Sequence, residues 1–236
     1  MKLLALDSSG LVASVAVVGD EILSGEYTIN HKITHSETLL PVLEELANVI
    51  ELDLDALDAI AVAGGPGSFT GLRIGSATAK GLALALKKPL IQIPTVDALA
   101  YNLWGHRDLV CPLMDARRNQ TYTGLYRFFD GRMETIKEQC AVDIGTIINE
   151  INQREEAVVF LGDGVPVFRD YIKEHIQVPY TFAPPHLSRQ RAGAVASLAV
   201  EYYKAGKMMD SASYRPEYLR LSQAERERME KENAAN

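Results

Sequence analysis

The chain has 236 residues and a formal net charge of −7 at pH 7. This length suffices for one large domain or two compact ones. An acidic balance argues against a protein that grips nucleic acid alone, because phosphate contacts need clustered Lys and Arg. The sequence contains no apolar run long enough to cross a membrane, and its first residues pass directly into a strand pattern. We therefore expect a cytoplasmic protein with no membrane partner.

The first hundred residues alternate between strand and helix patterns. Three short apolar runs separated by turns predict an antiparallel meander, and leucines at helical spacing then predict an amphipathic helix. The order is three strands, helix, strand, helix, strand and helix, over residues 3–6, 13–18, 22–28, 36–50, 60–63, 71–86, 90–94 and 95–104. Thr95 is expected to cap the last of these helices.

The remaining chain repeats this order. Strand patterns are followed by alternating helix and strand patterns, over residues 110–115, 121–129, 134–142, 144–151, 158–161, 167–175 and 191–205. The repetition predicts an α/β protein built as a diverged tandem of one βββαβα unit. We expect one lobe over residues 1–106, a second over 107–222 and a charged tail over 223–236.

A glycine turn, Gly64 to Gly67, separates the strand at 60–63 from the helix that follows. Glycines permit backbone angles closed to other residues, and the amides at a helix start attract anions. The weak candidates for nucleotide contact are Asp7, at the end of the first strand, with Gly65, Gly67, Ser68 and Thr70. A tight strand-to-helix connection, with the two hydroxyls as helix caps, explains the same residues. Neither a Rossmann fingerprint nor a Walker loop fits the spacing.

The helix after this turn carries a strip almost without side chains. Gly71, Gly75, Ala79 and Ala83 recur every fourth residue, which places them on one surface. A glycine inside a helix costs about 1 kcal/mol relative to alanine. Close packing against another helix offsets that cost, and this second helix belongs either to the chain itself or to a partner.

Two further groups of polar residues carry weaker signals. His31 and His35 have the spacing of helical metal ligands, but they straddle a helix start without a carboxylate beside them, so we predict no metal site. Asp115, Arg117 and Arg118 share a turn between strands. Arginine forks suit a phosphate or a partner's carboxylate, and a plain charged hairpin explains the turn equally well.

Several stretches together resemble a known family. They lie at residues 4–9, 34–41, 65–75, 112–117 and 218–224 and thus cover the chain from end to end. The sequence closely resembles the TsaB family, also called YeaZ, a subunit of the bacterial machinery that makes N6-threonylcarbamoyladenosine beside the anticodon of tRNA. The family's fold is similar to actin and hexokinase (the ASKHA class), with two βββαβα lobes, which agrees with the tandem pattern.

The resemblance also implies a division of labour. The catalytic relative, TsaD, carries an H-x-x-x-H metal motif on the helix after its glycine turn, where this chain has Asp97 and Tyr101. The resemblance therefore implies a noncatalytic subunit with no cofactor of its own. ATP or ADP and the metal are expected on the partners, a TsaD-like catalytic subunit and a TsaE-like ATPase. Contact with tRNA is expected only through the complex.

The resemblance further implies that this subunit pairs with TsaD through helices of its first lobe. Alone, it is expected to form a homodimer through the same helices. The small-residue strip is then expected to face a partner's helix. The predicted interface residues are Leu39, Leu43, Leu46, Gly71, Arg73, Gly75, Ala79, Leu82 and Ala83.

Two other functions remain open at this point. One is an independent nucleotide-dependent phosphotransferase of the sugar-kinase type, which would use Asp7 and the glycine loops around Gly65 and Gly162. The other is a metallopeptidase, an activity once attributed to the TsaD lineage.

Overall fold

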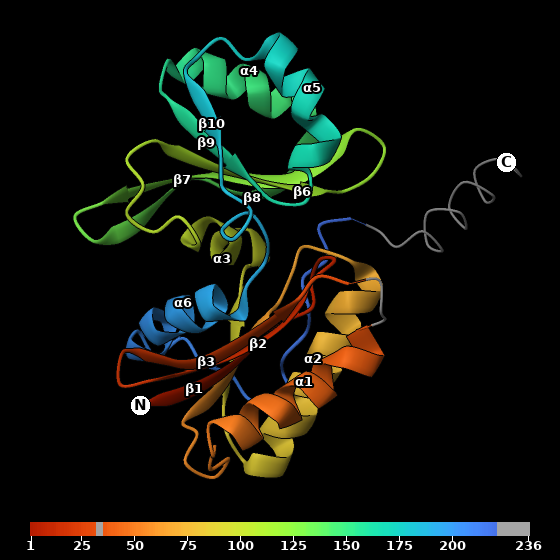
Figure 1. Cartoon of the computed structure of the whole chain (residues 1–236), viewed down its shortest axis with the longest axis vertical. Helices are drawn as coiled ribbons and strands as arrows, with labels where there is room; N and C mark the ends of the chain where they lie inside the picture. The colour runs from red at the N-terminus through yellow and green to blue at the C-terminus, as the bar shows by residue number, and fades with distance from the viewer. Residues whose placement is uncertain (32–34, 221–236) are drawn as a thin grey trace, which may run out of the picture.

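Two five-stranded sheets, one in each half of the sequence, organise the chain (Figure 1). The structure is a computed structural model that describes residues 1–31 and 35–220. The predicted charged tail, 223–236, lies outside the described residues. In the described part, no helix is both long and apolar enough to span a membrane.

The first sheet has the order β3-β2-β1-β4-β5. Its strands are β1 (Lys2–Asp7), β2 (Ala13–Gly19), β3 (Ile22–Ile29), β4 (Ala59–Ala63) and β5 (Leu90–Ile93). The first three form the predicted antiparallel meander, and β4 and β5 add in parallel. The two central strands, β1 and β4, are almost wholly apolar because helices cover both of their faces.

Helices from both halves of the chain cover this first sheet. α1 (His35–Val49) and α2 (Phe69–Leu86) pack on one face, and α6 (Ala192–Lys204) packs on the other. The predicted division placed α6 in the second lobe, and this is wrong. The first sheet presents alanines to α6, whose buried side is also rich in Ala and Val, so the helix and the sheet approach closely.

The second sheet has the order β10-β9-β6-β7-β8 and repeats the first in topology. Its strands are β6 (Leu109–Asp115), β7 (Gln120–Phe129), β8 (Arg132–Asp143), β9 (Val158–Leu161) and β10 (Tyr180–Phe182). The tandem of βββαβα units is therefore confirmed. The sequence pattern missed β10 because three residues are too few to show a period.

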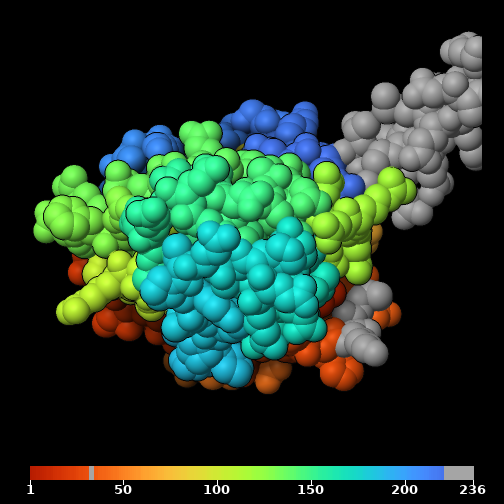
Figure 2. All heavy atoms as spheres, turned by 90° about the horizontal axis from the view of Figure 1, so that it is seen from above, coloured from red at the N-terminus to blue at the C-terminus, as the bar shows by residue number. Residues whose placement is uncertain are grey.

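Three helices cover the second sheet. α4 (Ile144–Arg154) and α5 (Val165–His175) form its outer face, which dominates the view from above (Figure 2). α3 (Thr95–Tyr101) packs on the inner face, and it also packs against α6. α3 and α6 thus form a helical layer between the two sheets, and this layer joins the lobes.

Candidate functional site

The glycine turn between β4 and α2 is held by the start of α3. Gly65 has a φ of +115°, a region that favours glycine. Its N–H donates to Thr95 Oγ1 at 3.1 Å, and its carbonyl accepts from Thr95 N at 2.9 Å. Thr95 was predicted to cap α3, but the N-cap is Pro94. The threonine hydroxyl instead fixes the turn.

The turn between β1 and β2 fills the space above the glycines. Ser8 Oγ donates to the Gly71 carbonyl at 2.9 Å, and Ser68 N donates to the Ser9 carbonyl at 2.7 Å. A Cβ on Gly67 would collide with the Ser9 carbonyl, and one on Gly71 with the Ser8 carbonyl. The glycines of this stretch therefore let two segments of the same chain come together.

Ser68 is the N-cap of α2, as predicted. Its Oγ accepts from Gly71 N at 3.3 Å, and its carbonyl accepts from Leu72 N at 2.8 Å. Thr70 is exposed on the outside of the helix. Much of the hydrogen-bonding capacity at this helix start is thus used inside the chain.

Asp7 closes the β1 end of the same assembly. Its side chain is 1% exposed, and Oδ1 accepts from Ser9 N at 2.9 Å and from Ser9 Oγ at 2.6 Å. Burial raises the pKa of Asp7 to about 6, against the two hydrogen bonds from Ser9 that lower it. The carboxyl group serves the turn rather than an open ligand site.

The second glycine loop, between β9 and α5, is packed in the same way. Gly162 N donates to the Ser188 carbonyl at 3.0 Å, and Gly164 N donates to the Leu113 carbonyl at 2.8 Å. A Cβ on Gly162 would collide with the Leu113 carbonyl. Asp163 lies between the two glycines, and burial raises its pKa.

Asp97 and Tyr101, expected at the positions of the metal-binding histidines, lie at the junction of the lobes. Asp97 accepts from the Tyr126 hydroxyl at 2.6 Å, and burial raises the pKa of the aspartate. Tyr101 is half-buried and lies edge-on to Phe128 at 6.2 Å. Both side chains connect α3 to its surroundings. Among the described residues, no group of three or more His, Cys, Asp or Glu is arranged to hold a metal.

Two of the remaining polar candidates, His35 and Arg117, have partners inside the chain. His35 Nε2 lies 2.9 Å from the Gly10 carbonyl, and His31 is exposed. Arg117 is exposed at the β6–β7 turn and pairs with Asp115 at 3.1 Å. These residues therefore do not converge on a common site.

The outward face of α1 and α2 carries an apolar groove of about 480 Å³. Among its lining residues are Leu40, Pro41, Ala47, Leu52, Leu54 and Leu82. Leu40, at this groove, is 53% exposed, and Leu84, which lines a separate hollow at the end of α2, is 73% exposed. Large exposed apolar side chains gathered beside a groove are typical of a protein interaction surface.

Most of the predicted interface residues do not lie on this face. Seven of them are buried inside the first lobe: Leu39, Leu43, Leu46, Gly71, Gly75, Ala79 and Ala83. The small-residue strip faces the chain's own sheet and the β1–β2 turn. A helix surface without large side chains can pack closely against any backbone, and here that backbone belongs to the same chain. Arg73 is exposed, and two further predicted residues line the groove: Leu82, which is half-buried, and Leu43, which is buried beneath it.

Sequence reasoning missed the apolar residues that do face outward. Leu40 and Leu84 lie outside the buried stripe of their helices. The row Ala77, Gly81 and Ala85, on the opposite side of α2 from the buried strip, is exposed as well. An apolar side chain on the polar side of an amphipathic helix is the signal that could have found this surface.

Charge is divided between the two helices of this face. α1 carries three glutamates, Glu37, Glu44 and Glu45, and neither Lys nor Arg. α2 carries Arg73 and Lys80 and no acid, and Lys87 and Lys88 follow it directly. The outward face is therefore acidic along one helix and basic along the other.

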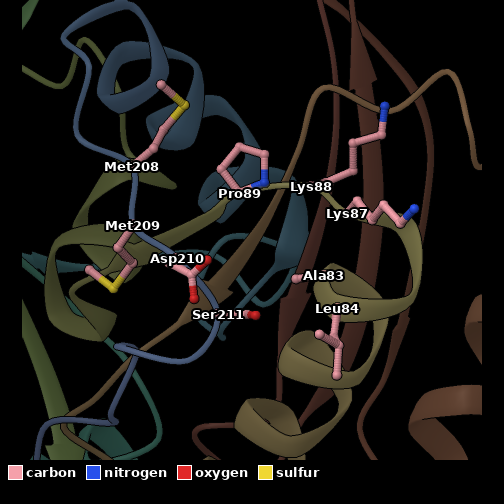
Figure 3. Close-up of a pocket in the computed structure, with 9 residues that line it drawn as sticks. All are labelled: Ala83, Leu84, Lys87, Lys88, Pro89, Met208, Met209, Asp210 and Ser211. Atoms are coloured by element: carbon pink, nitrogen blue, oxygen red, sulfur yellow. The ribbon is translucent and has the colours of Figure 1, made fainter.

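A second hollow, of about 520 Å³, lies at the end of α2 (Figure 3). Ala83, Leu84 and Pro89 line one side, and the segment Met208–Ser211 lines the other. The amino groups of the two lysines at its rim point away from that segment (Figure 3). The two amino groups therefore do not point into the hollow together with the polar side chains of the segment on its other side (Figure 3).

Comparison with solved structures places this fold. It resembles the (R)-2-hydroxyglutaryl-CoA dehydratase component A of Acidaminococcus fermentans with a TM-score of 0.50 and 10% identity, covering 88% of this chain and 100% of the other. At this identity the likeness concerns the fold alone. With two βββαβα lobes joined by a helical layer, the protein has the actin- and hexokinase-like fold.

Closer relatives identify the family within that class. The family model described as TsaD, tRNA N6-adenosine threonylcarbamoyltransferase, matches residues 26–228. The Bacillus subtilis tRNA threonylcarbamoyladenosine biosynthesis protein TsaB is 31% identical over 95% of this chain and 96% of its own length. YeaZ from Pseudomonas aeruginosa superposes with a TM-score of 0.77 at 26% identity, covering 92% of this chain and 99% of that one. The chain belongs to the TsaB (YeaZ) family.

Proposed function

We propose that this protein is a noncatalytic subunit that binds and activates a TsaD-like catalytic subunit, which transfers threonylcarbamoyl to the tRNA adenosine beside the anticodon. The observation that carries this proposal is the outward face of α1 and α2. It combines exposed leucines, an apolar groove and divided charge. Family membership suggests the reaction, because the named relatives act in the biosynthesis of threonylcarbamoyladenosine in tRNA.

The division of charge supports a paired-helix interface. A two-fold axis through this face would bring the acidic α1 of one copy toward the basic α2 of the other. A homodimer of the isolated chain would therefore be self-complementary. The TsaD-like subunit would replace one copy by presenting a similar pair of helices.

The packing of the glycine turns supports a noncatalytic role. Asp7 is buried and accepts hydrogen bonds from Ser9, and Asp97 accepts one from Tyr126, so both carboxyl groups are engaged within the chain. In this proposal ATP or ADP and the metal belong to the TsaD-like subunit and to a TsaE-like ATPase. Contact with tRNA runs through the assembled complex.

Two substitutions on the outward face test the interface. Leu40→Asp and Leu84→Asp place a charge where the proposed partner packs, and both side chains are exposed, so folding should be preserved. We expect each variant to weaken association by at least about ten-fold, the cost of about 1.4 kcal/mol. Co-elution with the TsaD-like subunit and sedimentation of the isolated chain measure the two associations.

Val167→Asp is the matched control, because Val167 is 58% exposed on α5 of the other lobe. Unchanged association of both leucine variants would refute this surface. Reconstituted tRNA modification with and without this chain tests the activating role. Full activity in its absence would refute that role.

The location of the nucleotide is tested on the isolated chain. We expect titration calorimetry with ATP and magnesium to show no saturable heat, because the proposal places the nucleotide on the partner subunits. Stoichiometric binding by this chain alone would instead favour a phosphotransferase of the sugar-kinase type.

A further inference from the structure

The last described segment of the chain crosses from the first lobe to the second over the glycine turn (Figure 1). It leaves the edge of the first sheet at Met209, which pairs with Leu90. We call residues 210–220 the C-terminal strap. Its hydrogen bonds reach α2, the glycine turn, β8 and the β6–β7 turn.

Tyr214 anchors the strap in the core of the first lobe. This side chain is fully buried, and its hydroxyl lies 3.0 Å from Ser76 Oγ on α2. Lys80, one turn further along α2, donates to the Tyr214 carbonyl at 3.4 Å. Tyr214 therefore attaches this end of the strap to α2.

The middle of the strap occupies the glycine turn. Glu217 N donates to the Gly64 carbonyl at 2.7 Å. A Cβ on Gly65 would collide with the Glu217 carbonyl, so the glycine makes room for the strap backbone. The next residue, Tyr218, stacks on Phe69 in the first turn of α2 with ring centroids 4.1 Å apart.

The second lobe holds the strap at two points. Gln139 of β8 donates from Nε2 to Glu217 Oε2 at 3.0 Å and to the Gly65 carbonyl at 3.2 Å. Arg220 donates from Nη1 to the Ala116 carbonyl in the β6–β7 turn. Gln139 therefore joins the strap and the turn beneath it to the same strand.

We propose that the C-terminal strap is a latch, through which the second lobe fixes the glycine turn and the first turn of α2. The backbone of the strap at Glu217 lies against Gly64 and Gly65 of the turn, and Gln139 of the second lobe holds it there. The proposed partner face lies on α2, so the latch would control the order of the helix that the partner binds. That consequence rests on the proposed function, whereas the latch itself does not.

Cutting the clamp tests the latch in the full-length chain. The double variant Gln139→Ala/Arg220→Ala removes the two side chains, one on β8 and one on the strap, that join the strap to the second lobe. We expect amide hydrogen exchange over residues 64–72 to accelerate at least about five-fold, because opening of this region no longer has to break the clamp. Exchange in α6 should stay unchanged.

Two control variants remove polar side chains from β8 and from the strap that do not join the strap to the second lobe. Lys137, also on β8, pairs with Glu150 of α4 at 2.9 Å. The hydrogen bonds of Arg215 to the carbonyls of Ala212 and Tyr214 stay within the strap. Lys137→Ala and Arg215→Ala should leave exchange over residues 64–72 as in the parent chain.

A second pair of variants tests the link to α2. Tyr218→Ala removes the stack on Phe69, and Tyr218→Phe keeps it. We expect faster exchange at the start of α2 only for the alanine variant. The latch is refuted if the double variant accelerates exchange in the strap alone, or nowhere. Exchange is measured without a partner, so this result is independent of whether the α1–α2 face binds one.

Discussion

Burial of the single carboxyl group of Asp7 makes the stability of the folded protein depend on pH. Its Oδ1 accepts both hydrogen bonds from Ser9, yet burial still raises its pKa from 3.8 to about 6. The folded state therefore holds this proton more tightly than the unfolded state. The resulting stabilisation is complete below about pH 4 and is lost as the pH rises through about 6.

We expect Asp7→Asn to stabilise the protein at pH 8 by about 3 kcal/mol and to leave stability unchanged near pH 4, because about 1.4 kcal/mol corresponds to one pKa unit. The amide oxygen can accept both Ser9 hydrogen bonds. Urea unfolding at pH 4, 6 and 8 measures the effect. Asp130→Asn, in the exposed β7–β8 turn, controls for loss of a negative charge. Equal stability of the Asp7→Asn variant and the parent chain at pH 8 would contradict the burial argument.

At the scale of the element, α2 contains glycines with opposite roles. Gly71 lies against the β1–β2 turn, and a Cβ there would collide with the Ser8 carbonyl. Gly81 is exposed, with no atom within 4 Å of an added Cβ. One glycine is therefore required by packing, and the other only lowers helix propensity.

The two alanine substitutions should consequently differ in sign. Gly81→Ala should raise the free energy of unfolding by about 1 kcal/mol. Gly71→Ala should lower it by about 3 kcal/mol, since a backbone carbonyl has to move to admit the methyl group. Urea titrations of both variants at one pH provide the comparison, with each serving as the other's control. Stabilisation by both would mean that the β1–β2 turn does not rest on α2 as described.

The same packing changes how larger substitutions in this helix are interpreted. Gly75→Leu or Ala79→Leu would introduce bulk between α2 and the first sheet, because both positions are buried inside the lobe. Loss of dimer or complex in such variants would report unfolding rather than a blocked interface. Leu40 and Leu84 are the informative positions.

At the scale of the whole molecule, the lobes are joined by a buried layer instead of a flexible linker. α3 packs its apolar side on the second sheet and also contacts α6, which packs on the first. Within this layer the Tyr126 hydroxyl donates to Asp97 at 2.6 Å. This hydrogen bond joins strand β7 of the second lobe to α3, which follows β5 of the first.

Removing that hydroxyl should therefore weaken the junction of the lobes. We expect Tyr126→Phe to destabilise the protein by about 2 kcal/mol at pH 8, because the buried Asp97 carboxylate loses its donor. The loss should shrink as the pH falls through the pKa of Asp97, which burial raises. Thermal unfolding at several pH values from 8 down to 4 tests both statements. Tyr180→Phe is the control, since the described structure shows no hydrogen bond to the Tyr180 hydroxyl. A pH-independent effect would place the contribution of Tyr126 in packing alone.

The sequence by itself determined the order of elements apart from β10, the tandem of βββαβα units and the family. These follow from local information: apolar periodicity, glycine turns and motifs that stay contiguous along the chain. It also showed that α2 must approach another backbone closely, because only such contact explains Gly71, Gly75, Ala79 and Ala83.

Only the tertiary structure decided which backbone that is. The strip faces the chain's own sheet and the β1–β2 turn, whereas the proposed partner face carries the exposed Leu40 and Leu84. Likewise, α6 crosses to the first sheet, and Glu217 reaches Gly64 from more than 150 residues away. Periodicity gives the face of a helix that is buried, but the identity of its neighbour depends on contacts between residues far apart in the chain.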